Sequence, residues 1–143
     1  YNNSIIITLR GLNMLTKTDY YSKCQNEQQF KMAWLKRQEG RGYSRFCIET
    51  EETVKGFPDV LEINKLTQTC SFYEFKYTRT GKIKFQPTQP AFYKANPDLI
   101  ICVVAYNAKT GTVHKFGVDC LFNENCEYAL NDKAEVDLSK AEL

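Results

Sequence analysis

The 143-residue sequence predicts one α/β domain in which helices flank a mixed central sheet. Helical and strand patterns alternate along the chain, and residues 98–107 form a nearly continuous apolar run typical of a buried central strand. A short helical segment lies between that run and the preceding strand. Such a succession implies a right-handed crossover, so we expect the third and fourth strands to be parallel.

The first predicted helix covers residues 19–39, which contain neither Gly nor Pro and are followed by Gly40. Apolar side chains recur on one stripe at helical spacing: Tyr20, Cys24, Phe30 and Trp34. Glu27 falls on the same stripe and is therefore predicted to face inward. It is either a boundary carboxylate bonded to a neighbouring backbone group or a functional acid.

Three strands are predicted next, and they form a meander: residues 43–50, 58–64 and 69–77. The polar segment 51–56 joins the first two strands. Glu62 lies three residues beyond Asp59, hence on the opposite strand face, and is expected to be structural.

The second half of the chain is predicted to complete the sheet. Residues 78–86 form a turn and a basic connection, 86–96 a short helix with prolines near its start, and 98–107 the central strand. A turn then leads into a fifth strand at 112–118, in which His114 is expected to be a surface residue.

The domain is expected to span residues 14–143, with residues 1–13 a tag remnant or upstream segment. From about residue 119 the chain is acidic and weakly periodic, with a terminal helix predicted near 133–143. Residues 1–116 hold 17 Lys and Arg against 10 Asp and Glu, whereas residues 117–143 hold 2 against 7. The basic body can attract phosphate backbones, and the acidic tail can pack as a solvated helix or screen that body.

The segment 75–97 contains no acid, and its basic residues alternate with aromatic ones. Four of them are candidate nucleic-acid contacts: Arg79, Lys82, Lys84 and Lys94. This pattern suits a nucleic-acid surface, and it also suits an amphipathic helix that covers a sheet. Tyr77, Phe92 and Tyr93 are candidates for base stacking or for the core.

The six cysteines form no CxxC pair and the chain has one histidine, which excludes zinc-finger and iron–sulfur spacings. We interpret them as reduced thiols, with Cys70 and Cys102 buried in strands, in a reducing compartment such as the cytoplasm. A secreted six-cysteine framework is the alternative. No apolar run is long enough to span a membrane.

Pro58-Asp59 and Glu74-Phe75-Lys76 carry the candidate chemistry. Glu74 and Lys76 are two apart on a strand and so share a face, and Asp59 can approach Glu74 if their strands are adjacent. Two carboxylates and a backbone carbonyl are hard oxygen ligands for Mg²⁺ or Mn²⁺, and a lysine beside them can orient water. The competing interpretation is that these residues only decorate a solvent face.

These two elements resemble the motif of the PD-(D/E)xK nuclease superfamily, with Gly56-Phe57-Pro58-Asp59-Val60 as the first part and Glu74-Phe75-Lys76 as the second. The chain looks closest to VRR-NUC-type nucleases of the phage-encoded, structure-specific sort, and more distantly like Holliday junction resolvases. The segment 84–92 is similar to the family's glutamine-bearing helix, with Gln89 as that residue and Glu27 as the acid of the first helix. Pro90 directly after Gln89 departs from the pattern and predicts a helix start near 87–89.

The resemblance implies a restriction-endonuclease-like core of helix, three-stranded meander, helix and strand. It implies a Mg²⁺- or Mn²⁺-dependent deoxyribonuclease that cuts branched, flapped or Holliday-junction DNA as a homodimer, in the host-cell cytoplasm if viral. One or two metal ions would be held by Glu27, Asp59, Glu74 and the carbonyl of Phe75. Lys76 would position the attacking water, with Gln89 in support. The alternatives are a toxin or restriction-type nuclease domain of a larger protein, and an inactive nuclease-fold module that binds nucleic acid.

Overall fold

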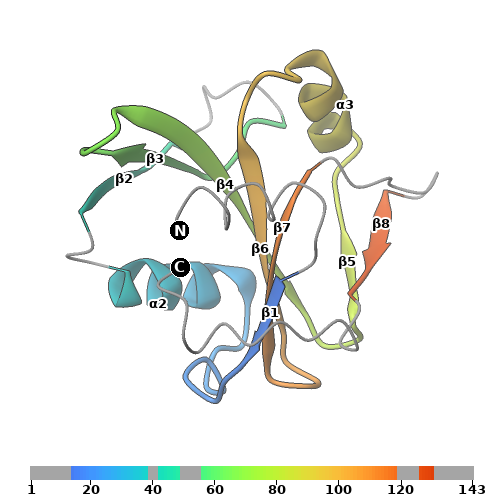
Figure 1. Ribbon diagram of the computed structural model, residues 1–143. Helices are drawn as coiled ribbons and strands as arrows, with labels where there is room; N and C mark the ends of the chain where they lie inside the picture. Colours follow the sequence, from blue (N-terminus) through green and yellow to red (C-terminus); the bar gives the residue numbers. More distant parts are fainter. Residues whose placement is uncertain (1–13, 39–41, 49–55, 119–125, 131–143) are drawn as a thin grey trace.

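The chain folds around a central sheet, and the computed structural model describes residues 14–38, 42–48, 56–118 and 126–130 (Figure 1). The helices and strands within these residues are, in chain order, β1 (Met14–Lys17), α2 (Glu27–Arg37), β2 (Tyr43–Cys47), β3 (Val60–Asn64), β4 (Thr69–Thr78), β5 (Lys82–Lys84), α3 (Thr88–Ala95), β6 (Ile101–Asn107), β7 (Thr112–Gly117) and β8 (Glu127–Ala129).

The central sheet is mixed and six-stranded, with the order β1-β7-β6-β4-β3-β2. β2, β3 and β4 form the antiparallel meander that the sequence predicts. β4 and β6 run parallel, with Glu74 opposite Val103 and Lys76 opposite Ala105. Since α3 lies in the connection between these two strands, the predicted parallel crossover is confirmed.

Different layers cover the two faces of the sheet. On one face α2 packs Phe30 and Trp34 against Phe75 of β4. Residues of α3, β5 and β8 pack on the other face, over β6 and β7; Figure 1 shows α2 on one side of the sheet and β5 and β8 on the other. Because side chains alternate along a strand, Glu74 and Lys76 belong to the α3 face while Phe75 belongs to the α2 face.

The first helix is shorter than predicted. It covers Glu27–Arg37 rather than residues 19–39, because Asn26 adopts an extended conformation and caps it. The Oδ1 atom of Asn26 accepts a 2.8 Å hydrogen bond from the backbone N–H three residues later. Tyr20 and Cys24 therefore precede the helix instead of lying on its apolar stripe.

Three short strands were absent from the sequence prediction. β1 pairs with β7 at the edge of the central sheet, and β5 pairs with β8 as a separate two-stranded sheet. β5 lies within the predicted basic connection 78–86 and has only three residues, too few to establish an alternating pattern. The helix predicted near 133–143 lies outside the described residues, as do residues 1–13 and most of the connection 51–56.

The predicted environments of two side chains are wrong, whereas a third, the buried thiol of Cys102, is confirmed. Cys70 is exposed, because β4 extends beyond its pairing with β6, which begins at Phe72. His114 is fully buried rather than on the surface, because β1 covers the outer edge of β7. Its Nε2 lies 2.9 Å from the hydroxyl oxygen of Thr112. No helix of the described residues is long and apolar enough to cross a membrane.

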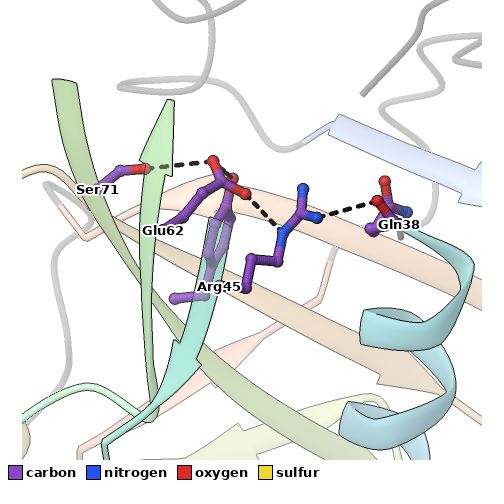
Figure 2. Close-up of polar contacts among 5 residues, drawn as sticks. Gln38, Arg45, Glu62 and Ser71 are labelled. Atoms are coloured by element: carbon purple, nitrogen blue, oxygen red, sulfur yellow. Dashed lines mark hydrogen bonds and ion pairs between the residues drawn. The ribbon is translucent and has the colours of Figure 1, made fainter. Parts of the chain in front are cut away.

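A polar network joins the meander to the end of α2 (Figure 2). Arg45 donates from Nε to Glu62 at 2.8 Å and from Nη1 to the carbonyl oxygen of Gln38 at 3.0 Å. Glu62 also accepts hydrogen bonds from Tyr73 at 3.1 Å and Ser71 at 3.4 Å. Glu62 thus pairs with Arg45, and Arg45 in turn bonds the residue that caps the C-terminal end of α2. This agrees with the structural role predicted for Glu62.

Candidate active site

Two carboxyl groups meet on the α3 face of the sheet. Asp59 directly precedes β3, whose first residue Val60 pairs with Tyr73, so Asp59 lies beside Glu74 of β4. Both side chains are buried, with exposed fractions of 5% for Asp59 and 2% for Glu74. Asp59 Oδ2 accepts a 3.1 Å hydrogen bond from the backbone N–H of Phe75, which anchors its carboxyl group to β4.

The environment of Glu74 opposes its ionisation. Burial raises the pKa of Glu74 well above its ordinary value, and the charge of Asp59 and a hydrogen bond between the two carboxyl groups raise it further. Lys76 acts in the opposite direction and lowers the pKa. Among the described residues, Oε1 of Glu74 has no hydrogen-bond partner although it is buried. Without a cation, the pair therefore retains a proton at neutral pH.

This donor set fits a hard divalent cation. A buried carboxylate oxygen without a partner, next to a second carboxylate, would be stabilised by a positive ion that accepts oxygen ligands. The set is small, because within the described part of the chain no three His, Cys, Asp or Glu side chains converge on one point. Glu27 in particular does not join Asp59 and Glu74. It is exposed, on the first turn of α2, the helix that packs on the opposite face, and its charge raises the pKa of Glu74 less than that of Asp59 does.

Lys76 and Gln89 are brought together. Lys76 Nζ donates a 3.1 Å hydrogen bond to Oε1 of Gln89, and the same oxygen accepts the backbone N–H of Gln86 at 2.9 Å. The ammonium group also lies 4.8 Å from the centre of the Phe85 ring. Two contacts thus hold the half-buried Lys76 amine on the same face as the carboxyl pair.

The helix that carries Gln89 begins where the sequence predicts. α3 starts at Thr88 with Pro87 as its N-cap, so Pro90 falls in the first turn. Proline is tolerated there because the N–H groups of the first turn have no partner within the helix.

Gly56 allows the loop before Asp59 to contact this first turn. Its φ is +88°, and a Cβ atom at this position would lie 2.1 Å from the carbonyl oxygen of Thr88. Any larger residue would therefore push α3 away from the loop. Gly56 thus couples the position of Asp59 to that of Gln89.

Tyr93 is a residue of the site that sequence reasoning assigned only to stacking or to the core. Its side chain is buried, and its hydroxyl group interacts with the carboxyl group of Glu74. Burial and the nearby carboxylates raise the pKa of Tyr93 above its ordinary value. The available signal was spacing, because Tyr93 follows Gln89 by four residues and so shares its helix face.

The basic candidates are all exposed: Arg79, Lys82, Lys84 and Lys94. Lys82 and Lys84 flank buried Ile83 on β5, so both point to solvent. Arg79 follows β4 and donates a 3.1 Å hydrogen bond to the carbonyl oxygen of Gln25.

The chain has a restriction-endonuclease-like fold, in which two helices flank a six-stranded mixed sheet. It is similar to the solved structure of a Holliday junction resolvase from the archaeal hyperthermophile Archaeoglobus fulgidus, with a TM-score of 0.54 and 12% sequence identity. The similarity covers 75% of this chain and 89% of the resolvase chain. No protein-family model matches the sequence, and no curated protein matches it. At this identity the likeness concerns the fold.

Proposed function

We propose that the protein is a divalent-metal-dependent nuclease that hydrolyses phosphodiester bonds of DNA. One observation carries the proposal: a buried carboxylate oxygen of Glu74, which has no hydrogen-bond partner among the described residues, lies beside Asp59 on the face that also holds Lys76. The fold supports it, since a resolvase of similar fold acts on nucleic acid, as its name states.

Asp59, Glu74 and the backbone carbonyl of Phe75 would hold Mg²⁺ or Mn²⁺. When bound, such an ion polarises the phosphate and lowers the pKa of a coordinated water. Binding requires that the proton of the carboxyl pair be released, because both carboxylates then face the same positive charge. Glu27 is not included among these metal ligands. It adds negative charge from the side of α2.

Lys76 is proposed to orient the water and to stabilise negative charge on the phosphate. Its ammonium group has three N–H donors, and Gln89 occupies one of them. The others can reach a phosphate oxygen or the attacking water. Because Gln89 is itself fixed by Gln86, the amine is held in place before the substrate binds, which is the condition for efficient electrostatic stabilisation.

The proposed substrate is branched, flapped or four-way DNA, and the proposed assembly is a homodimer. The exposed basic residues Arg79, Lys82, Lys84 and Lys94 can contact the DNA backbone. A symmetric junction is cut at two places, so a chain with one site requires a second copy.

The test is cleavage of labelled linear, flapped and four-way DNA in Mg²⁺ or Mn²⁺, with Asp59→Asn and Lys76→Ala compared with the intact chain. Both variants are expected to lose cutting by at least about 100-fold, in line with the loss of a group that stabilises the transition state. Asp98→Asn and Lys65→Ala are the matched controls. They remove a carboxylate and an ammonium group, as Asp59→Asn and Lys76→Ala do, but from exposed residues. Cutting that survives Asp59→Asn would contradict the proposal.

A module that binds nucleic acid without cutting it is the second candidate. It is favoured by the position of Glu27, outside the carboxyl pair. Junction binding by the intact chain with no cutting in either metal would select this candidate.

A further inference from the structure

An open hollow of about 670 Å³ lies at the carboxyl ends of β4 and β6. Three cations from separate segments of the chain line it: Lys23, Arg79 and Lys109. Cys24, Gln25 and Tyr77 also line it, and none of the described residues that line it is acidic. Figure 1 shows the loop between β1 and α2 and the β6–β7 turn at the same end of the sheet.

Neutral groups hold the guanidinium of Arg79. Nη2 donates to the carbonyl oxygen of Gln25 at 3.1 Å, and Nε lies 3.4 Å from the hydroxyl oxygen of Tyr77. That hydroxyl donates to the carbonyl oxygen of Cys24 at 2.9 Å, which fixes the tyrosine in turn. The arginine is therefore positioned while its charge is left uncompensated by these contacts.

The described residues that line the hollow carry a net positive charge. Within the described part of the chain, no carboxylate lies at ion-pair distance from Lys23, Arg79 or Lys109. The acids nearest to Lys23 in the sequence are Asp19 and Glu27, and neither lines the hollow. A concave surface lined by positive charges attracts anions, and a fixed guanidinium matches the geometry of phosphate oxygens.

The hollow lies beyond Lys76 along β4, on the α2 side of the sheet. Arg79 follows Lys76 by three residues, about 10 Å at the strand rise of roughly 3.3 Å per residue. Each strand of duplex DNA advances about 3.4 Å per nucleotide. Because the two side chains project from opposite faces of β4, the path between them runs round the carboxyl end of the strand, so a phosphate held by Arg79 lies more than three nucleotides from one held by Lys76.

We infer that the hollow is a second anchoring site, which binds a phosphodiester group flanking the bond to be cut. Lys23, Arg79 and Lys109 supply the contacts. The inference rests on the proposed function and extends it to a part of the surface on the α2 side of β4. Lys23 and Lys109 lie far apart in the sequence, and only the fold brings them together.

The test is the salt dependence of binding to labelled single-stranded and four-way DNA in EDTA, where metal-dependent cutting cannot occur. The double variant Lys23→Gln/Lys109→Gln is compared with Lys36→Gln/Lys65→Gln. All four lysines are exposed, and both variants lose two charges, so the comparison isolates position. The slope of log affinity against log salt is expected to fall by about 1 for each lysine–phosphate interaction that the first variant removes, and to stay unchanged in the second.

Equal slopes in the two double variants would overturn the inference. A second arm uses inorganic phosphate and thermal unfolding of the intact chain and of Lys23→Gln/Lys109→Gln. Stabilisation of the intact chain alone, with equal DNA slopes, would assign the hollow to a free anion and also overturn the inference.

The two proposals can fail separately. Different slopes together with no cutting in Mg²⁺ or Mn²⁺ would support the hollow and reject the nuclease. Metal-dependent cutting with equal slopes would reject the hollow and leave the nuclease in place.

Discussion

Glu74 is a carboxyl group in surroundings that make its charge costly. It is buried, one of its oxygens has no hydrogen-bond partner among the described residues, and Asp59 adds a second negative charge. An unsatisfied buried polar group lowers stability unless a ligand compensates it. The residue therefore favours ligand binding at the expense of the stability of the metal-free chain.

Stability of the metal-free protein is expected to fall as the pH rises above about 4.5, the ordinary pKa of Glu74. Above that pH the unfolded chain releases a proton that the folded state keeps on the carboxyl pair. The free energy of unfolding therefore falls with rising pH until the folded pKa is passed, and is constant above it. Glu74→Gln removes this loss. In EDTA at pH 8 it is expected to stabilise the protein by roughly 1 to 3 kcal/mol, with a smaller effect at pH 4. Thermal unfolding of the intact chain and of Glu74→Gln at pH 8 and pH 4 measures the two stability differences.

The same experiment includes Mg²⁺. The ion should raise the unfolding temperature of the intact chain and not that of Glu74→Gln, because a ligand stabilises only the state that binds it. Asp98→Asn is the control for the loss of an exposed carboxylate. Destabilisation by Glu74→Gln in EDTA at pH 8 would show that burying the Glu74 carboxyl group does not lower the stability of the metal-free chain.

At the level of elements, the contact between the loop before β3 and the first turn of α3 assembles the candidate site. The loop ends at Asp59, and the turn contains Gln89, which holds Lys76. Gly56 lies at the contact between them. The relative position of the carboxyl pair and the amine therefore depends on one close approach of two backbone segments.

Gly56→Ala is expected to destabilise the protein by more than Gly42→Ala. Both glycines have positive φ, +88° at Gly56 and +81° at Gly42, so both substitutions carry a backbone cost of about 1 to 2 kcal/mol. Only at Gly56 does the added Cβ meet described backbone atoms, those of Thr88. Chemical denaturation of both variants measures the difference.

A difference of at least about 1 kcal/mol is expected, because α3 must shift to relieve the contact. The shift should also lower the rate of cutting in Gly56→Ala while leaving Gly42→Ala unaffected. Equal stabilities of the two variants would show that the loop and α3 are not tightly packed.

At the level of the whole molecule, the main aromatic packing and the proposed chemistry lie on different faces of the sheet. The α2 face contains an aromatic cluster and the network of Arg45 and Glu62, which hold the layers together. The α3 face contains the carboxyl pair and Lys76. Stability and activity are therefore expected to respond to different substitutions.

Arg45→Met is expected to destabilise the protein by about 3 to 5 kcal/mol, because it leaves the Glu62 carboxylate buried without its cation. Methionine retains an unbranched apolar side chain next to Trp34, so the loss is chiefly electrostatic. Well below the unfolding temperature, cutting by the folded variant should be unchanged. Asp59→Asn should show the opposite behaviour, with lost cutting and retained stability.

Lys36→Met is the control for this comparison, since Lys36 is exposed and lies on the same helix as Trp34. Unfolding temperature and cutting rate are measured on the same samples. Parallel losses of stability and activity in Arg45→Met would refute the separation of the two faces.

Much of the fold was accessible from the sequence because its signals are local. Apolar and aromatic runs predicted the meander and the central strand, and the helix between them required the parallel pairing of β4 and β6. Errors arose where a local signal was weak or was overridden. Asn26 caps the start of α2 within a segment whose pattern is helical on both sides of it. The strands β1, β5 and β8 are too short to display a periodicity.

The candidate site divides along the same line. Strand alternation placed Glu74 and Lys76 on one face, and the meander brought Asp59 beside Glu74, because both follow from spacing along neighbouring strands. The burial of Glu74, the absence of a partner for its Oε1 among the described residues and the approach of Tyr93 depend on packing against α3, which pattern alone does not specify. The inward position predicted for Glu27 relied on a helix start that Asn26 replaced.

The sequence by itself determined the α/β class, the order of the main elements and the residues that share a strand face, because these depend on neighbours a few positions apart. Only the tertiary structure decided the burial of His114, the exposure of Cys70, the separation of Glu27 from the carboxyl pair and the convergence of Lys23 with Lys109. Each of these depends on contacts between segments distant in the chain, and such contacts leave no local pattern.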